Sequence, residues 1–116
     1  MTMQEFMILI REDLEKLAQL SPEQMEADIQ LVTDWIGQLA QKGQFLGGHP
    51  LHSLGKTVRA NTITDGPYLE LKEGVSGYLL LQAQDMDEAV QIASTFPTLF
   101  RGDALEIRPL MKLPGA

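Results

Sequence analysis

Two short runs of the chain, 5–11 (EFMILIR) and 77–83 (GYLLLQA), are apolar at most positions and predict core strands. Side chains of a strand alternate between its two faces, so each of these strands carries apolar side chains on both faces. The run 104–109 (ALEIRP) alternates instead, with Leu105 and Ile107 on one face. It predicts a last strand with one apolar face and one charged face.

The longest periodic segment predicts a helix between the first two strands. Ser-Pro-Glu-Gln at 21–24 supplies a cap, a first-turn proline and a capping-box partner, and Gly43 marks the end. The apolar positions at helical spacing are Met25, Ile29, Val32, Ile36 and Leu39. Leu31 and Trp35 fall beside this stripe, and we assign them to the core or to an interface with a neighbour.

The remaining elements are shorter. In chain order they are a helical turn over 12–20, a strand over 45–48, an irregular loop over 49–55, a hairpin over 57–64 and a helix from Asp85 to Pro97. The hairpin turns at Ala60-Asn61, where asparagine tolerates positive φ, and Asp65-Gly66-Pro67 then turns the chain again. The order β-α-β-(hairpin)-β-α-β predicts an α+β, ferredoxin-like antiparallel sheet with two helices on one face.

One face of this sheet lacks a cover. Two helices cover a single face, yet both core strands are apolar on both faces. A large exposed apolar patch usually marks an interface, and a second copy around a two-fold axis covers it with no further element. We therefore predict a homodimer whose sheets face each other. Glu106 and Arg108 then point to the dimer side, where buried charges must pair.

Composition narrows the classes of partner. With 116 residues, the chain is expected to form one domain, 1–116. Its formal net charge of −7 disfavours nucleic acid, because phosphate contacts need lysine and arginine. Its apolar runs are far shorter than the ~20 residues that span a membrane. The chain has no cysteine and no secretory start signal, so we expect a cytoplasmic protein without disulfides.

Several short segments occur in an order that is fairly specific when taken together. They are FMILIR from Phe6, LSPE from Leu20, Gly47-Gly48, TVR from Thr57, TDGPY from Thr64, Lys72-Glu73, Gly77-Tyr78 and EIRPL from Glu106. With them the chain resembles the YCII-related superfamily, and within it the DGPF-domain branch. The resemblance implies a ferredoxin-like fold that dimerises into a dimeric α+β barrel. It implies little about activity: most members have no assigned reaction, some relatives act on small molecules such as chlorinated aromatic breakdown products, and other DGPF proteins are associated with sigma-factor regulators.

The chain departs from that family's pattern in three places. Tyr68 stands where the DGPF signature has phenylalanine, and the hairpin before Asp65 is shorter than is typical. The family's proposed His-Asp dyad has its histidine near the start of the long helix, but residues 12–22 contain no histidine. That dyad therefore cannot be carried over to this chain.

Candidate chemistry gathers in the middle of the chain. His49 and His52 lie three apart in a glycine-flanked loop, and a metal would need a third ligand such as Asp65 or Glu70. We favour exposed loop histidines over a metal site. No nucleotide loop, Ser-His-Asp order or zinc framework is present, so we expect neither a cofactor nor a metal. Asp65 and Tyr68 serve either the turn or a ligand, and both interpretations stay open.

Charged residues offer binding groups. Glu70 and Lys72 share one face of an extended segment, as a solvated ion pair or a substrate-positioning pair. Arg108 either pairs with Glu106 or holds an acidic ligand between the sheets. These residues define the first functional hypothesis, a protein that binds or transforms a small acidic or aromatic metabolite. Its catalytic candidates are His49, Asp65 and Tyr68, and its substrate-binding candidates are His52, Glu70, Lys72 and Arg108.

The second hypothesis is a non-catalytic dimeric module that binds a ligand or a regulatory partner. A deep polar pocket that contains His49 favours the first hypothesis, and a fully packed interior favours the second. The homodimer is expected under both. We expect Leu81→Asp, in a core strand, to disrupt it in light scattering; an intact dimer would show that this strand is misplaced.

Overall fold

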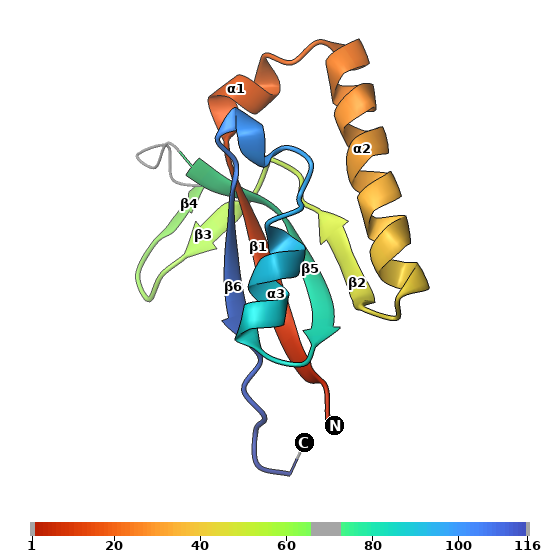
Figure 1. The fold of residues 1–116 in the computed structure, drawn as a ribbon. Coiled ribbons are helices and arrows are strands. Elements are labelled where there is room, and N and C mark those ends of the chain that lie inside the picture. The colour runs from red at the N-terminus through yellow and green to blue at the C-terminus, as the bar shows by residue number, and fades with distance from the viewer. Residues whose placement is uncertain (1, 66–72, 116) are drawn as a thin grey trace.

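The structure is a computed structural model that describes residues 2–65 and 73–115. Its elements are β1 (Gln4–Asp13), α1 (Leu14–Ala18), α2 (Pro22–Gln41), β2 (Phe45–Pro50), β3 (Lys56–Val58), β4 (Ile63–Asp65), β5 (Glu73–Ala83), α3 (Met86–Ala93), η1 (Leu99–Arg101) and β6 (Ala104–Pro109). Figure 1 shows one antiparallel sheet in the order β2-β5-β1-β6, with β3 and β4 as a separate hairpin. The α+β, ferredoxin-like prediction is confirmed.

The core lies between this sheet and the helices α2 and α3. Phe6 and Ile8 on β1 stand opposite Leu81 and Leu79 on β5, and all four side chains are buried. They form one cluster with Trp35 and Leu39 of α2 and with Ala89, Ile92 and Ala93 of α3. Leu105 and Ile107 on β6 pack against the same cluster, as their alternation predicted. The helices α2 and α3 therefore cover the same face of the sheet.

The opposite face carries the other half of the alternating side chains. Met7 on β1 stands opposite Leu80, and Leu9 stands opposite Tyr78. We call this surface, with Met7, Leu9, Tyr78 and Leu80 at its centre, the open face. Each of the four is half-buried within the chain. The molecule measures 44 × 41 × 18 Å, so its thin dimension holds one sheet and one layer of helices.

The open face corrects one expectation from the sequence. Leu81 is fully buried in the helix-covered core, where it stands opposite Phe6. The prediction that Leu81→Asp probes a dimer interface is therefore wrong, because that change would place a charge inside the subunit's own core. Leu80, one position earlier, has the side chain on the open face.

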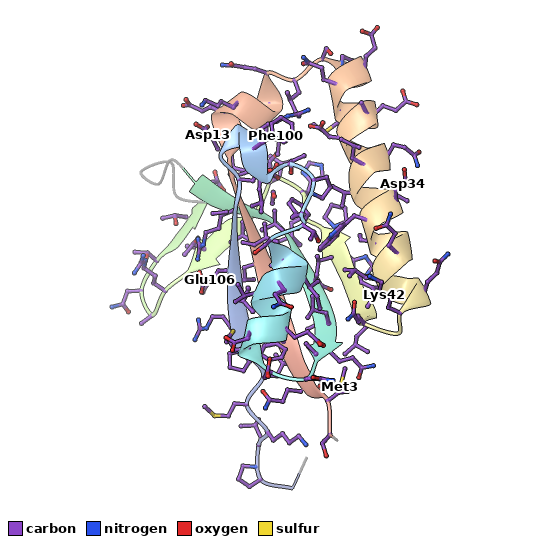
Figure 2. The ribbon with its side chains drawn as sticks, viewed as in Figure 1. Met3, Asp13, Asp34, Lys42, Phe100 and Glu106 are labelled. Atoms are coloured by element: carbon purple, nitrogen blue, oxygen red, sulfur yellow. The ribbon has the colours of Figure 1, made fainter. Side chains whose placement is uncertain are left out.

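The long helix begins and ends where the sequence predicts. Ser21 Oγ accepts a hydrogen bond from the Gln24 amide at 3.1 Å, and Gln24 Oε1 accepts one from the Ser21 amide at 3.2 Å. Gly43, with φ of +71°, follows the last turn. The exposed Asp34 marks the outer side of α2 (Figure 2). Of the helices in residues 2–65 and 73–115, none combines the length and apolar character needed to cross a bilayer.

The two halves of α2 pack differently. Trp35 and Leu39 in the C-terminal half are buried, and Trp35 Nε1 donates a hydrogen bond to Thr95 Oγ1 at 2.8 Å. The Trp35 ring also meets Phe96 edge-on, with 5.2 Å between centroids. Ile29, which the periodicity places in the core stripe, is 58% exposed. The helix is thus anchored to the core near its end and stands away from the sheet near its start.

Two further expectations need correction in the middle of the chain. β2 continues through His49 and Pro50, which the sequence assigned to a loop; the proline is tolerated because β2 is an edge strand. The β3–β4 hairpin turns at Ala60-Asn61 as predicted, with the Arg59 amide donating to the Thr62 carbonyl at 2.7 Å. No non-glycine residue in the described chain has positive φ, so the turn does not use that tolerance of asparagine.

Candidate functional site

A cavity of about 410 Å³ lies between the first half of α2 and the sheet. Its apolar walls include Ile29, Val32 and Ile36 from the helix and Ile10 and Leu79 from the strands. Ligand pockets commonly have volumes from about 300 to 1,000 Å³. This space is partly open to solvent, since Ile29 in its wall is 58% exposed, and its size suits a small molecule.

Two glycines leave this space unfilled. Gly48 on β2 and Gly77 on β5 occupy helix-facing positions, opposite Leu79 and Pro50. A Cβ atom added to Gly48 would lie 2.5 Å from the Tyr78 carbonyl oxygen, and one added to Gly77 would lie 3.2 Å from the His49 carbonyl oxygen. The close approach of β2 and β5 thus excludes a side chain at Gly48 and leaves little room for one at Gly77. Because neither glycine has a side chain, the sheet offers α2 little to pack against here.

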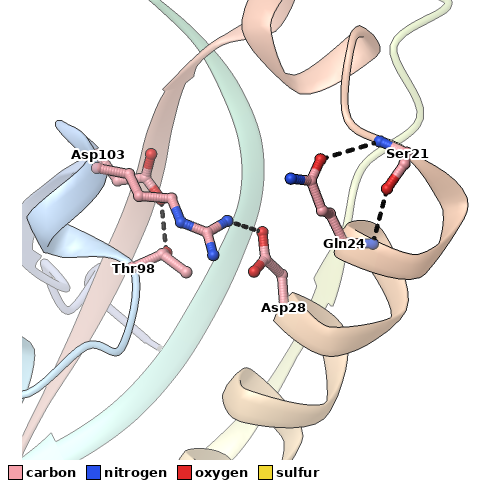
Figure 3. A network of polar contacts seen from close by, with 6 residues as sticks. Ser21, Gln24, Asp28, Thr98 and Asp103 are labelled. Carbon is pink, nitrogen blue, oxygen red and sulfur yellow. Dashed lines mark hydrogen bonds and ion pairs between the residues drawn. The ribbon is translucent and has the colours of Figure 1, made fainter.

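One end of the cavity is polar. Glu12 from β1, Asp28 from α2, Ser76 from β5 and Thr98 from the segment before η1 all line it. Asp28 Oδ2 forms an ion pair with Arg101, the dashed contact beside Asp28 in Figure 3. Asp28 Oδ1 is buried and has no hydrogen-bond partner within the described part of the chain. Asp28 therefore brings a carboxylate with one unsatisfied acceptor to the polar end of the space.

The surroundings of Glu12 raise the pKa of its carboxyl. Burial raises the pKa of its carboxyl, a hydrogen bond with Ser76 opposes this, and the negative charges of Asp103 and Asp28 raise the pKa further. Asp103 itself accepts a hydrogen bond from Thr98 Oγ1 at 2.6 Å, as Figure 3 shows. The polar end thus combines a carboxyl whose pKa is raised, Glu12, with a carboxylate, Asp28, that has a guanidinium partner.

A second space of about 330 Å³, which we call the vestibule, shares lining residues with this end of the cavity. Its polar lining includes Asp13, Lys16, Arg101 and Asp103. The two spaces share four lining residues, which are Glu12, Leu17, Asp28 and Thr98. These residues lie at the junction between an apolar chamber under α2 and a charged vestibule beside η1.

The predicted histidines lie apart from the polar end. His49 lines the cavity, but its ring stands beside that of Tyr78, with 5.9 Å between centroids. Since His49 and Tyr78 are direct partners across the strands, alternation places both rings on the open face. His52 is exposed, and its Nδ1 accepts a hydrogen bond from the Leu54 amide at 3.3 Å.

The other predicted residues do not line the cavity or lie outside the described residues. Asp65 is exposed and forms an ion pair with Lys56 at 2.8 Å within the hairpin. Arg108 is largely exposed and lies 3.7 Å from Glu106. Tyr68, Glu70 and Lys72 belong to the segment 66–72, outside the described residues. Within residues 2–65 and 73–115, no group of three histidine, aspartate or glutamate side chains is arranged to hold a metal ion.

Glu106 has a nearer partner that sequence reasoning missed. Arg11 Nη2 lies 2.6 Å from Glu106 Oε1, on the open face next to Leu9 (Figure 2 labels Glu106). The hydrogen bond from Arg11 lowers the pKa of the Glu106 carboxyl, partly offset by burial. The open face therefore carries a paired charge at the β6 edge of its apolar centre.

Glu12, Asp28 and Thr98 were also missed from the sequence. Asp28 gave one usable signal, since it follows Met25 by three positions and precedes Val32 by four, inside the apolar stripe of α2. A carboxylate at a core-facing position needs a partner or a function. Glu12 and Thr98 are distant in sequence and meet Asp28 only through the fold.

The fold and cavity together define a class: a ferredoxin-like α+β protein with a small-molecule-sized pocket beneath its long helix. Residues 4–113 match the YCII-related domain, so the chain belongs to the YCII-related family, as the resemblance predicted. Among curated proteins, none matches the chain.

The raised pKa of Glu12 predicts a pH-dependent stability. The folded carboxyl keeps its proton to higher pH than the unfolded one, so the unfolded state binds fewer protons in this window and the free energy of unfolding falls as pH rises above 4.5. Glu12→Gln removes this titration, so we expect a higher melting temperature at neutral pH and a flatter decline above pH 4.5 than in the unaltered protein. Thermal unfolding followed by circular dichroism across this range measures both.

Glu26→Gln is the matched control, because Glu26 is exposed on α2 and lines neither space. It removes the same charge and should leave the pH profile unchanged. If Glu12→Gln does not raise the melting temperature at neutral pH relative to its effect at acid pH, the burial argument for Glu12 is wrong.

Proposed function

We propose that this protein binds a small molecule with an apolar or aromatic body in the cavity beneath α2. The observation that carries the proposal is a 410 Å³ space with apolar walls and one polar end. Phe96 contributes an aromatic wall, and Ile29 and Val32 contribute aliphatic ones. A space of this size between the helix and the sheet supports a ligand site over a fully packed interaction module.

The chemistry available at the polar end is proton transfer. Glu12 has a raised pKa and lines the cavity beside Ser76, so it is placed to donate a proton to a bound molecule. Of the two ligand classes expected from the sequence, the aromatic one suits these walls better. An acidic group would meet the carboxylate of Asp28 and the carboxyl of Glu12. We therefore propose that any reaction here is general acid catalysis by Glu12 on a substrate without an anionic group.

We also propose that the working form is a homodimer through the open face. Met7, Leu9, Tyr78 and Leu80 form a half-buried apolar centre that is flanked by the Arg11–Glu106 pair. The cavity lies on the other side of the sheet, so dimer formation leaves it accessible. We also propose that the chain belongs to the DGPF branch of the family. This assignment stays a proposal because most of the DGPF signature falls in 66–72, outside the described residues.

A larger side chain in the cavity should weaken the binding of an aromatic ligand. N-phenyl-1-naphthylamine, a neutral aromatic dye that fluoresces in apolar sites, serves as the probe. We expect Ile29→Trp to weaken its binding by about tenfold or more, about 1.4 kcal/mol, because the indole occupies the space under α2. Fluorescence titration measures the dissociation constant.

Leu31→Trp is the matched control, since Leu31 is 45% exposed on the same helix and does not line the cavity. It should leave the dye affinity unchanged. Equal affinities in the unaltered protein and in a folded Ile29→Trp variant would place the dye elsewhere and refute this proposal.

The dimer has its own test at the open face. Leu80→Asp places a charge at the centre of that face, so we expect a folded monomer where the unaltered protein is a dimer. Light scattering coupled to size exclusion gives the mass, and circular dichroism checks the fold. Leu31→Asp, on the helix layer, should stay dimeric. A monomeric unaltered protein at micromolar concentration would contradict the proposed interface.

A further inference from the structure

We propose that the cavity and its vestibule together select an amphipathic molecule whose head group is a hydrogen-bond donor, an amine or a hydroxyl, seated at Asp28, and that they reject a carboxylate head. This inference rests on the proposed function, because it assumes that the cavity is the ligand site. It adds the orientation of the ligand and the chemical class of its polar end.

The position of the head group follows from the two linings. The cavity, which we also call the inner chamber, has mainly apolar walls, whereas charged side chains line the vestibule. The two meet at Glu12, Leu17, Asp28 and Thr98. A molecule that fills the inner chamber with its apolar body therefore has its polar end at this junction. The reverse orientation would bury a polar group among Val32, Ile36 and Leu79 without partners.

The oxygen atom that lacks a partner at the junction, Asp28 Oδ1, is a hydrogen-bond acceptor. Arg101 occupies Asp28 Oδ2, while Oδ1 is buried and has no partner within residues 2–65 and 73–115. A carboxylate has acceptor sites only, so a donor must complete it. A buried acceptor left without a donor costs free energy, and a bound amine or hydroxyl removes that cost.

The surrounding charges select against an anion. The ionisable side chains that face Asp28 across the junction and vestibule are Glu12 on β1, Asp13 before α1, Lys16 on α1, Arg101 on η1 and Asp103 before β6. With Asp28 itself, four acidic groups thus stand against two basic ones. Arg101 is already paired with Asp28, so it is not free to bind a second carboxylate at that atom.

Three probes of equal chain length test the head group: 1-octylamine, 1-octanol and octanoate, each competing with N-phenyl-1-naphthylamine. We expect octylamine to compete best and octanoate worst, with about a tenfold difference between them, as a charge-assisted hydrogen bond provides. Asp28→Asn keeps an oxygen for Arg101 but removes the negative charge. It should reduce the octylamine preference over octanoate severalfold, while Glu26→Gln, which removes the same charge outside both spaces, should leave it unchanged.

The comparison of probes on the unaltered protein does not depend on any variant folding. If the dye binds, Ile29→Trp blocks it, and octanoate still competes as well as octylamine, the head-group inference is wrong and the cavity remains the ligand site. An octylamine preference that survives Asp28→Asn would likewise overturn the assignment to Asp28. If the dye does not bind the cavity, both this inference and the proposed function fail.

Discussion

The close approach of β2 to β5 is the constraint on which this structure depends. The neighbouring backbone leaves no room for a Cβ at Gly48 and little room for one at Gly77. The same two positions face α2, so the sheet offers no side chain there for the helix to pack against. α2 is consequently held by Trp35 and Leu39 near its C-terminal end. The cavity is the space that remains under its other half.

The sheet divides the molecule into two surfaces with different uses. On the helix side, apolar walls lead to carboxyl groups at the junction of β1, α2 and η1, where Glu12 and Asp28 lie. On the open side, an apolar centre is bordered by the Arg11–Glu106 pair, and this is the surface that we propose as the dimer interface. The proposed ligand site and the proposed interface therefore lie on opposite faces of one layer of strands. A change such as Leu80→Asp tests the interface without altering the lining of the cavity.

Much of the fold follows from local signals in the sequence. The capping box at Ser21, the stop at Gly43 and the alternation of Leu105 and Ile107 each predict an element that the structure contains. The burial of individual side chains on α2 was less predictable, because helical periodicity alone does not show which of them contact other elements. Trp35 and Ile29 are both apolar residues of α2, but Trp35 is buried against Thr95 and Phe96 whereas Ile29 is largely exposed.

The candidate site was the least predictable part. Its polar end joins Glu12, Asp28 and Thr98 from three distant segments, and no local motif links them. His49 lines the cavity, but β2 continues through it and its ring lies beside that of Tyr78, away from Glu12 and Asp28. The sequence ended this strand two residues earlier, at Gly48, and so did not indicate on which face the ring lies. The Asp28 position inside an apolar helix stripe was the one signal that pointed to the cavity.

The central claim is that a ligand enters the space between α2 and the sheet. Methyl NMR of isoleucine-labelled protein titrated with N-phenyl-1-naphthylamine tests it most directly, because isoleucines lie both in the cavity wall and elsewhere. We predict large shifts and dye contacts at Ile10, Ile29 and Ile36, and unchanged signals from Ile63 in the hairpin and Ile92 in α3. Shifts at Ile63 or Ile92 with silent cavity methyls would contradict it.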